Sequence, residues 1–566
     1  MPDESAVALQ ALAERYWQML RFEFPLSAFL AGHPNEDPIL FRESPADHDR
    51  RARNAQAKLV ELRAIPLEDL LGQDRVTHRL LERELLDLCD SHATDSHLRP
   101  WLLPAGPEFN TIYFANTTQI QDAHEARAYV DRLRTLPGYF RDIQACLALG
   151  DERGIRHPGV VLTAAVANLR SAARGPADQT AWFAPFRRSI AAGDRLVGVH
   201  QDLAQAIIEG DMLPALCGLA DFMEGTLLPR ARESVACTDA PQGAAFYAHW
   251  VRHFTTSGQW SPETIHELGL QEVARLEREV ADLAEKAGFN GDGAAYRKYL
   301  REESGFVCAS AEELLERVQA LAKRIDGKIP SIIGRVPRST YSVQSIPAAL
   351  AEKLPLAYAQ PNPADGSAPG LFWVSALPER VPSYLHVSLV LHEAWPGHLM
   401  HIALLQEMSS LPMFRRAGFT KYSACLEGWA MYCEGLGEEM NLYASAHDRF
   451  GRLDMEMWRA CRLVVDTGLH LKGWSRRQAI DYMVGRLTLT PEAIEAEVDR
   501  YIAMPAQALG YMLGGLKFRE LRQRAQQRLG PHFRLRDYHD QLMAAGAVTL
   551  PVLEEVVQAW LDRHAA

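Results

Sequence analysis

The feature that most constrains this fold is a helical spacing of apolar residues that recurs along nearly the whole chain. Segment 261–288 opens with Ser-Pro, continues with apolar residues three to five positions apart, and stops at a Gly. Segment 310–327 opens with the capping box Ser-Ala-Glu-Glu and also ends at a Gly. After Pro551, another apolar stripe runs to the end of the chain. This pattern predicts a mainly α protein.

One region, residues 340–376, has a different pattern. Pro and Gly separate short apolar runs there, and a Pro-Asn-Pro-Ala-Asp-Gly stretch begins at Pro361. We therefore predict a small sheet of two or three strands inserted into the helical body. The strand at 371–374 is a candidate edge for pairing with an extended peptide.

Composition narrows the class of protein and its location. The chain has 566 residues, 47% of them hydrophobic, and a formal net charge of −12. This excludes a disordered chain and argues against a nucleic-acid partner, because no basic face is indicated. The runs Gly159–Leu169 and Val381–Leu391 are shorter than the ~20 residues of a membrane span, and the acidic start does not resemble a signal peptide. We therefore predict a cytoplasmic protein with no membrane partner, and its eight scattered cysteines indicate reduced thiols.

The strongest chemical motif is His-Glu-Ala-Trp-Pro-Gly-His at residues 392–398. In zinc hydrolases, two histidines and a later carboxylate hold the metal, and the Glu beside the first His is the general base. These histidines are normally four residues apart on one helix face. Here they are six apart, and at ~100° per residue the second would point about 240° away from the first. A bulge at Pro396 and Gly397 that absorbs two residues would bring His392 and His398 together.

The third ligand is expected on the next helix, in the segment 425–438. Glu427, Glu434 and Glu438 fall near one helix face there. Glu427 is the first choice and Glu434 the reserve. The competing interpretation is that these His and Glu side chains are solvated, but Pro-Gly within an apolar helix is costly and needs a reason.

Four strings carry a resemblance to a known family: HEAWPGHLMH from 392, LEGWAMYCE from 426, RLVVDTGLH from 462 and RYIAMPAQALGYMLG from 500. In this order they resemble the bacterial domain-of-unknown-function 885 (DUF885) family, over essentially the whole chain. That family is grouped with the gluzincin metallopeptidases and is similar in its metal motif to thimet-type oligopeptidases and angiotensin-converting enzyme. The resemblance implies a two-lobed helical body with a deep central channel.

Residue by residue, the resemblance implies Zn²⁺ held by His392, His398 and Glu427, with Glu393 as the general base. Two positions depart from the family pattern. His401 stands where the family has Gln, which leaves open whether it replaces His398 as a ligand. Ala506 stands where the family has Gly.

The remaining candidates are donors for the oxyanion that forms in peptide hydrolysis. We expect Tyr511 in this role, with Tyr501 second, and His470 as another donor or as a residue that orients a ligand. Both tyrosines are also compatible with ordinary core positions.

The sequence thus predicts a zinc hydrolase of short peptides, of carboxypeptidase, dipeptidase or oligopeptidase type. The alternatives are a zinc amidase acting on a non-peptide amide, and a catalytically retired peptidase fold that binds a partner. We expect one helical unit over 1–566, with lobes at 1–260 and 261–566.

Overall fold

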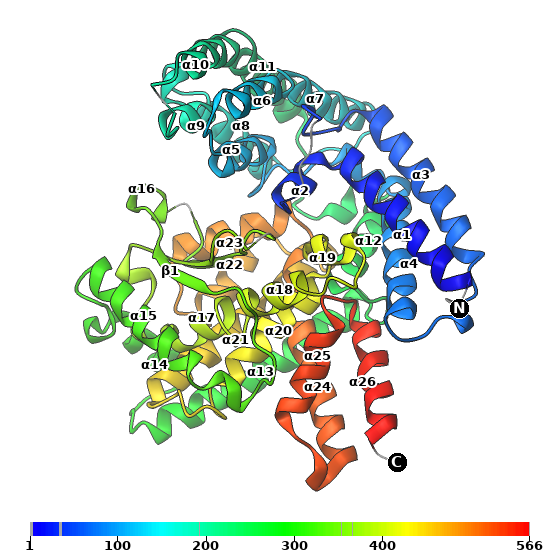
Figure 1. The fold of residues 1–566 in the computed structure, drawn as a ribbon. Coiled ribbons are helices and arrows are strands. Elements are labelled where there is room, and N and C mark those ends of the chain that lie inside the picture. Colours follow the sequence, from blue (N-terminus) through cyan, green and yellow to red (C-terminus); the bar gives the residue numbers. More distant parts are fainter. Residues whose placement is uncertain (1–3, 33–36, 192, 353, 365, 565–566) are drawn as a thin grey trace. The chain divides into compact units, whose positions relative to one another are not determined.

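The computed structural model describes residues 4–32, 37–191, 193–352, 354–364 and 366–564, and is mainly helical (Figure 1). The chain forms two compact units, each assembled from separate segments. Unit 1 comprises residues 1–70, 81–249 and 496–505, and unit 2 comprises 71–80, 250–495 and 506–566. The predicted lobes at 1–260 and 261–566 stay a prediction.

Unit 1 is built entirely from helices in its described residues. Large apolar side chains such as Leu196 and Val199 stay exposed, but all of its helices bury apolar residues. These helices are α1 (Glu4–Glu23), α2 (Pro25–Leu30), α3 (Pro45–Arg63), α5 (Pro107–Thr117), α6 (Ala123–Leu133), α7 (Leu136–Glu152), α8 (Gly159–Ala172), α9 (Ala184–Arg187), α10 (Arg195–Ile207) and α11 (Leu213–Phe222). Helices α4 (Gly72–Ala93), α12 (Gly243–Thr255) and α23 (Pro491–Ala503) contribute residues to both units.

Unit 2 contains the remaining helices and the sheet. The helices are α13 (Pro262–Lys286), α14 (Gly293–Glu302), α15 (Ala311–Asp326), α16 (Ala348–Ala351), α17 (His386–Glu393), α18 (His398–Gln406), α19 (Met413–Ala417), α20 (Ser423–Gly435), α21 (Ala446–Leu471), α22 (Arg476–Val484), α24 (Gly510–Leu529), α25 (Leu535–Ala545) and α26 (Leu550–His564). The predicted helices 261–288, 310–327 and the one after Pro551 are confirmed as α13, α15 and α26.

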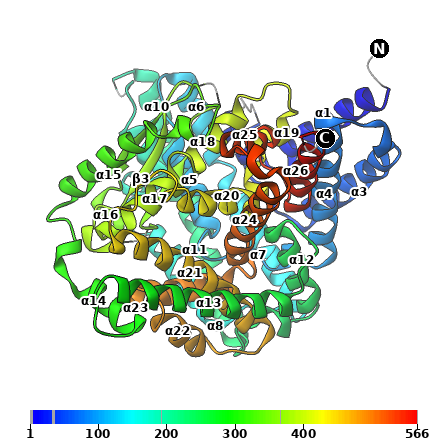
Figure 2. The same ribbon diagram turned by 90° about the horizontal axis from the view of Figure 1, so that it is seen from below.

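Helix α21 forms the core of unit 2 and is buried along most of its length. It packs along α13, and the two helices run side by side in Figure 2. Buried Glu456 of α21 forms ion pairs with Arg275 of α13 and Arg519 of α24, both at 2.5 Å. Because a buried carboxylate needs compensating charge, this network ties three helices to one another.

The predicted sheet is confirmed and has three strands: β1 (Tyr341–Ser345), β2 (Ala357–Gln360) and β3 (Gly370–Val374). The strand order is β1-β3-β2, with β3 parallel to β1 and antiparallel to β2. Strand β3 is therefore central, and the expectation that its edge is available to a peptide is wrong. The sheet packs against α17 and α18, which places it beside the helices that carry the metal motif.

One helical run, Arg195–Arg230, is long and apolar enough to cross a membrane. Its most apolar 18-residue window has a mean hydropathy of 1.3, and 39% of that window is buried. The run joins α10 and α11 through a π-helical turn at Ile208–Met212. Our sequence search weighed only shorter apolar runs and missed it. Core helices of soluble proteins pass the same test, so the run is weak evidence for a membrane span.

Candidate metal centre

The metal motif is placed by a break between two helices. Helix α17 ends at Glu393 and α18 begins at His398, so the expected bulge within one continuous helix is wrong. The indole Nε1 of Trp429 donates to the carbonyl oxygen of Pro396 at 2.8 Å and holds the connection. A Cβ at Gly397 would overlap the carbonyl oxygen of His392, so only Gly fits there. The break resets the helical phase, and the two histidines no longer need to share one face.

The structure brings His392, His398 and Glu427 together. The Nε2 atoms of the two histidines lie 3.5 and 3.3 Å from Oε2 of Glu427, and ligand atoms of all three residues lie within 4.8 Å of one another. Around a tetrahedral zinc, ligand atoms ~2.0–2.1 Å from the ion are about 3.4 Å apart. The two imidazole rings are nearly perpendicular, at 87°. Two imidazoles and one carboxylate are a donor set typical of catalytic zinc, so the residues fit the metal.

The charges of the three groups support one another. Burial alone would raise the pKa of Glu427, but the two histidines more than reverse this and hold it well below its usual range. Burial would lower the pKa of His392, yet Glu427 and Glu434 raise it to about 9. A metal ion takes the place of such protons, because imidazole and carboxylate ligands bind it in their deprotonated forms.

A second layer of contacts orients His392. Its Nδ1 lies 2.9 Å from Oε1 of Glu434, and Nη2 of Arg459 lies 3.3 Å from the same oxygen. The hydroxyl of Tyr443 donates to the backbone carbonyl of Glu434 at 2.6 Å, which fixes α20 at this point. A carboxylate behind a ligating imidazole turns the opposite nitrogen toward the metal. Glu434, the reserve ligand, therefore lies behind His392, whereas the three candidate ligand atoms belong to His392, His398 and Glu427.

Sequence reasoning missed Arg459 and Tyr443. Arg459 gives no distinctive signal in the sequence, because other charged residues, Glu456 and Arg462, lie three positions before and after it in α21. Tyr443 carries no such signal, since it lies outside the regular part of α20 and α21.

The comparisons with known proteins agree with the four sequence strings. The family described as "Bacterial protein of unknown function (DUF885)" matches residues 25–557. The chain belongs to the DUF885 family. No curated protein matches it.

Two solved structures share the DUF885 chain's fold. A proposed lipoprotein from Colwellia psychrerythraea has 28% sequence identity and a TM-score of 0.93, covering 99% of this chain and 100% of the other. A proposed lipoprotein of unknown function from Shewanella oneidensis has 16% identity and a TM-score of 0.76, covering 98% and 100%. The second likeness concerns the fold alone.

The departure from the DUF885 pattern at Ala506 has a structural counterpart. Ala506 has a φ of 68°, in the left-handed region where Gly is free of strain. Its backbone N–H donates to the carboxylate of fully buried Asp466, with N···O distances of 2.9 and 3.2 Å. Because this charge-assisted hydrogen bond opposes the strain, the chain accommodates Ala here, before the short 3₁₀ turn Gln507–Leu509 that leads into α24.

His401 is buried one helical turn after His398 and lies edge-on to the ring of Trp429, with ring centroids 6.2 Å apart. Burial and the neighbouring charge of His398 lower its pKa to about 4. The three ligand atoms that lie together belong to His392, His398 and Glu427 and do not include His401.

The remaining candidates are placed as follows. Glu393 is the last residue of α17, is 9% exposed, and forms no hydrogen bond or ion pair within the described residues. The hydroxyl of buried Tyr501 donates to Oε2 of Glu497 at 2.6 Å, in unit 1. The ring of half-buried Tyr511, in unit 2, stacks on the guanidinium of Arg462. His470 is fully buried near the end of α21. The catalytic roles of these residues stay predictions.

Proposed function

We propose that this DUF885 protein is a zinc-dependent hydrolase of short peptides. The observation that carries the proposal is the convergence of ligand atoms from His392, His398 and Glu427 within 4.8 Å of one another. Support comes from Glu434 and Arg459, which form the hydrogen-bonded layer that zinc-binding histidines require. Solvated His and Glu side chains would not need such a layer of contacts.

Each residue has a stated task in this proposal. Zinc, when bound, supplies a Lewis acid that lowers the pKa of water and polarises a carbonyl group. Glu393, next to His392 and without a hydrogen-bond partner among the described residues, accepts the proton of the attacking water and returns it to the leaving amine. Tyr511 is the preferred donor to the oxyanion and Tyr501 the second choice.

The test combines metal analysis with digestion of a peptide library. We expect about one zinc per chain in the wild type, and the same content in Glu393→Gln, since Glu393 is not a ligand. Cleavage by Glu393→Gln should fall about 10²–10⁴-fold, the usual contribution of a general base. The matched control is Glu438→Gln, which changes an exposed carboxylate ion-paired with Arg449 and should keep full activity.

The outcomes separate the alternatives. Cleavage products show whether the enzyme removes single residues, removes dipeptides or cuts internally. A zinc-bound protein that cleaves no peptide but hydrolyses a non-peptide amide, with loss of activity in Glu393→Gln, would favour the amidase. A protein that purifies without zinc, and whose Glu393→Gln variant behaves like the wild type, would favour the retired fold.

The location is a separate proposal. Our sequence prediction is the cytoplasm, whereas the Colwellia psychrerythraea protein is named as a proposed lipoprotein. That name favours a membrane-anchored or exported location for this chain as well. Fractionation of the native cells decides: recovery in the membrane or exported fraction supports the lipoprotein alternative, and recovery in the cytosol supports the sequence prediction.

A further inference from the structure

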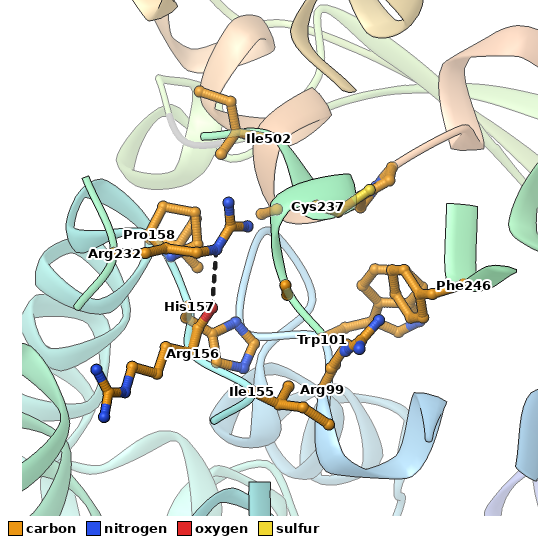
Figure 3. A pocket seen from close by; sticks show the side chains of 14 residues that line it. Arg99, Trp101, Ile155, Arg156, His157, Pro158, Arg232, Cys237, Phe246 and Ile502 are labelled. Atoms are coloured by element: carbon orange, nitrogen blue, oxygen red, sulfur yellow. Dashed lines mark hydrogen bonds between the residues drawn. The ribbon is translucent and has the colours of Figure 1, made fainter. Parts of the chain in front are cut away.

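Unit 1 contains a pocket that is separate in sequence and composition from the metal motif (Figure 3). Its cavity volume is about 30 Å³, and the larger space of about 420 Å³ includes its open mouth. Trp101, Phe246 and Ile502 contribute apolar walls, and the polar lining consists of three arginines and one histidine. The lining contains no Asp or Glu. The enclosed part therefore has room for a small polar group of a ligand, since a single water needs about 10–15 Å³ of such space.

Among the lining residues, the side chain of Arg99 points most strongly to an anionic ligand. Its side chain is 8% exposed, yet its Nε and Nη1 atoms are buried without a hydrogen-bond partner among the described residues. Only Nη2 is engaged, with the carbonyl oxygen of Pro241. The guanidinium lies over the ring of Phe246, 4.4 Å from its centroid, which holds its plane in place. A buried cation with two unused donors carries a desolvation cost that an anionic ligand would offset.

Arg232 is a second cation, and hydrogen bonds to neighbouring backbone carbonyls hold its side chain in place. Its backbone N–H donates to the carbonyl of His157 at 3.2 Å. Its Nε donates to the carbonyl of Arg156 at 2.8 Å (Figure 3). Nη1 donates to the carbonyls of Ser234 and Ala236. Its Nη2 makes no hydrogen bond within the described residues, so one donor of a rigidly held guanidinium is available to a ligand.

His157 completes the donor set. Its Nε2 is buried without a partner in the described part of the chain. Burial, together with the charges of Arg232 and Arg99, lowers its pKa to about 3, so the ring is neutral and offers one N–H. Two carboxylates outside the lining, Asp95 and Asp239, act electrostatically on the two arginines. Both have other partners: Asp95 pairs with Arg153, and Asp239 accepts a hydrogen bond from Ser234.

We propose that this pocket binds the oxyanion group, carboxylate or phosphate, of a small molecule. Two guanidinium groups with unused N–H donors and a neutral imidazole match the several acceptor oxygens of such a group. The apolar wall of Trp101 and Phe246 suits the body of the ligand. The proposal concerns unit 1 alone and does not depend on the zinc hydrolase activity.

The test uses inorganic phosphate and acetate as probes of the full chain at constant ionic strength. We expect one of them to bind saturably at about 10 mM or below and to raise the melting temperature in step with its occupancy. Arg99→Gln should weaken that binding about tenfold or more, because a charge-assisted hydrogen bond is lost. Arg232→Gln should do the same. The control is Arg134→Gln, an exposed arginine of the same unit that lies outside the lining and is paired with Asp131, and it should bind within about twofold of the wild type.

A wild-type measurement keeps the proposal testable if the variants do not fold. The bound probe should slow hydrogen exchange in 155–158 and 232–237, and leave α3 unchanged. Tighter binding of phosphate would assign a phosphate group, and tighter binding of acetate a carboxylate. The proposal is overturned if neither anion binds saturably, if Arg99→Gln binds like the wild type, or if the protected amides lie elsewhere.

Discussion

At the scale of single residues, the contact between His392 and Glu434 decides how the candidate centre is organised. Glu434 takes the Nδ1 side of the ring, which leaves Nε2 facing Glu427. Arg459 compensates the charge of this buried carboxylate. The candidate ligands are therefore held in position by neighbouring polar groups as well as by the backbone.

Replacing Glu434 with Gln tests this orienting role. The variant keeps the size of the side chain and removes its charge, so we expect zinc affinity to fall about 10–100-fold. Competition with a fluorescent chelator measures the affinity directly. Glu438→Gln is the control, because it removes an exposed carboxylate from the turn that follows α20. Equal zinc affinity in Glu434→Gln and the wild type would contradict the assignment.

Glu108 provides a pH-dependent prediction in unit 1. Burial raises the pKa of this carboxyl to about 7, from an ordinary value of 4.5. Between pH 4.5 and 7, Glu108 is protonated in the folded protein but ionised in the unfolded chain. Its contribution to the free energy of unfolding therefore falls as pH rises through this window, and stays low at higher pH. The Glu108→Gln variant has no ionisable group at this position, so its stability does not fall for this reason. Its free energy of unfolding relative to wild type should increase by roughly 2 kcal/mol from pH 5 to pH 8.

Urea unfolding at the two pH values measures this difference. Glu152→Gln, at an exposed carboxylate of the same unit, is the control and should show no comparable change. A difference between Glu108→Gln and wild type that is the same at pH 5 and pH 8 would contradict the prediction.

At the scale of elements, the position of Glu427 depends on how closely α20 approaches α24. A Cβ at Gly428 would lie 2.5 Å from backbone atoms of Gly514 on the facing helix. Both positions therefore need Gly, because any side chain would push the helices apart. Glu427 immediately precedes this crossing, so the packing of the two helices also places the ligand.

Gly428→Ala should consequently lower stability by about 1–3 kcal/mol, the usual cost of overpacking. Urea midpoints measure the stability, and chelator competition should show a weaker zinc site in the same variant. Gly435→Ala is the matched control at the end of the same helix, where an added Cβ would meet nothing within 4 Å. That control should be neutral or more stable by roughly 0.5–1 kcal/mol. A Gly428→Ala protein as stable as Gly435→Ala would refute the argument.

At the scale of the whole molecule, the candidate ligands all belong to unit 2. His392 and His398 lie on either side of a helix break and Glu427 lies on α20, so bound zinc would link three helices of one unit. Ligand binding stabilises the conformations that hold it. Zinc should therefore act mainly on unit 2.

Hydrogen exchange with and without zinc tests this expectation. We expect slower exchange in α17, α18 and α20, and little change in α6 and α7 of unit 1. In Glu427→Gln, which lacks one charged ligand, the zinc-dependent protection should be largely lost. Protection that is equal in the two units, or that persists in Glu427→Gln, would show that zinc binds elsewhere.

The sequence predicted well the features that depend on neighbours along the chain. Helix starts and stops follow from local caps such as Ser261, whose hydroxyl accepts from the backbone N–H of Thr264. The Pro and Gly residues between short apolar runs predicted the strands of the small sheet. They did not predict the order of the strands, so the central position of β3 was missed. Pro396 and Gly397 marked where the helix is interrupted, although not that it ends and restarts.

By itself, the sequence determined the helical class, the family and the identity of the candidate ligands, because these depend on local spacing and short strings. Only the tertiary structure decided that Glu434 lies behind His392, that Arg459 compensates it, and that Arg99, His157 and Arg232 meet in one pocket. The physical reason is that local spacing determines which side chains share a helix face. Which faces meet depends on packing between residues that are far apart in the chain.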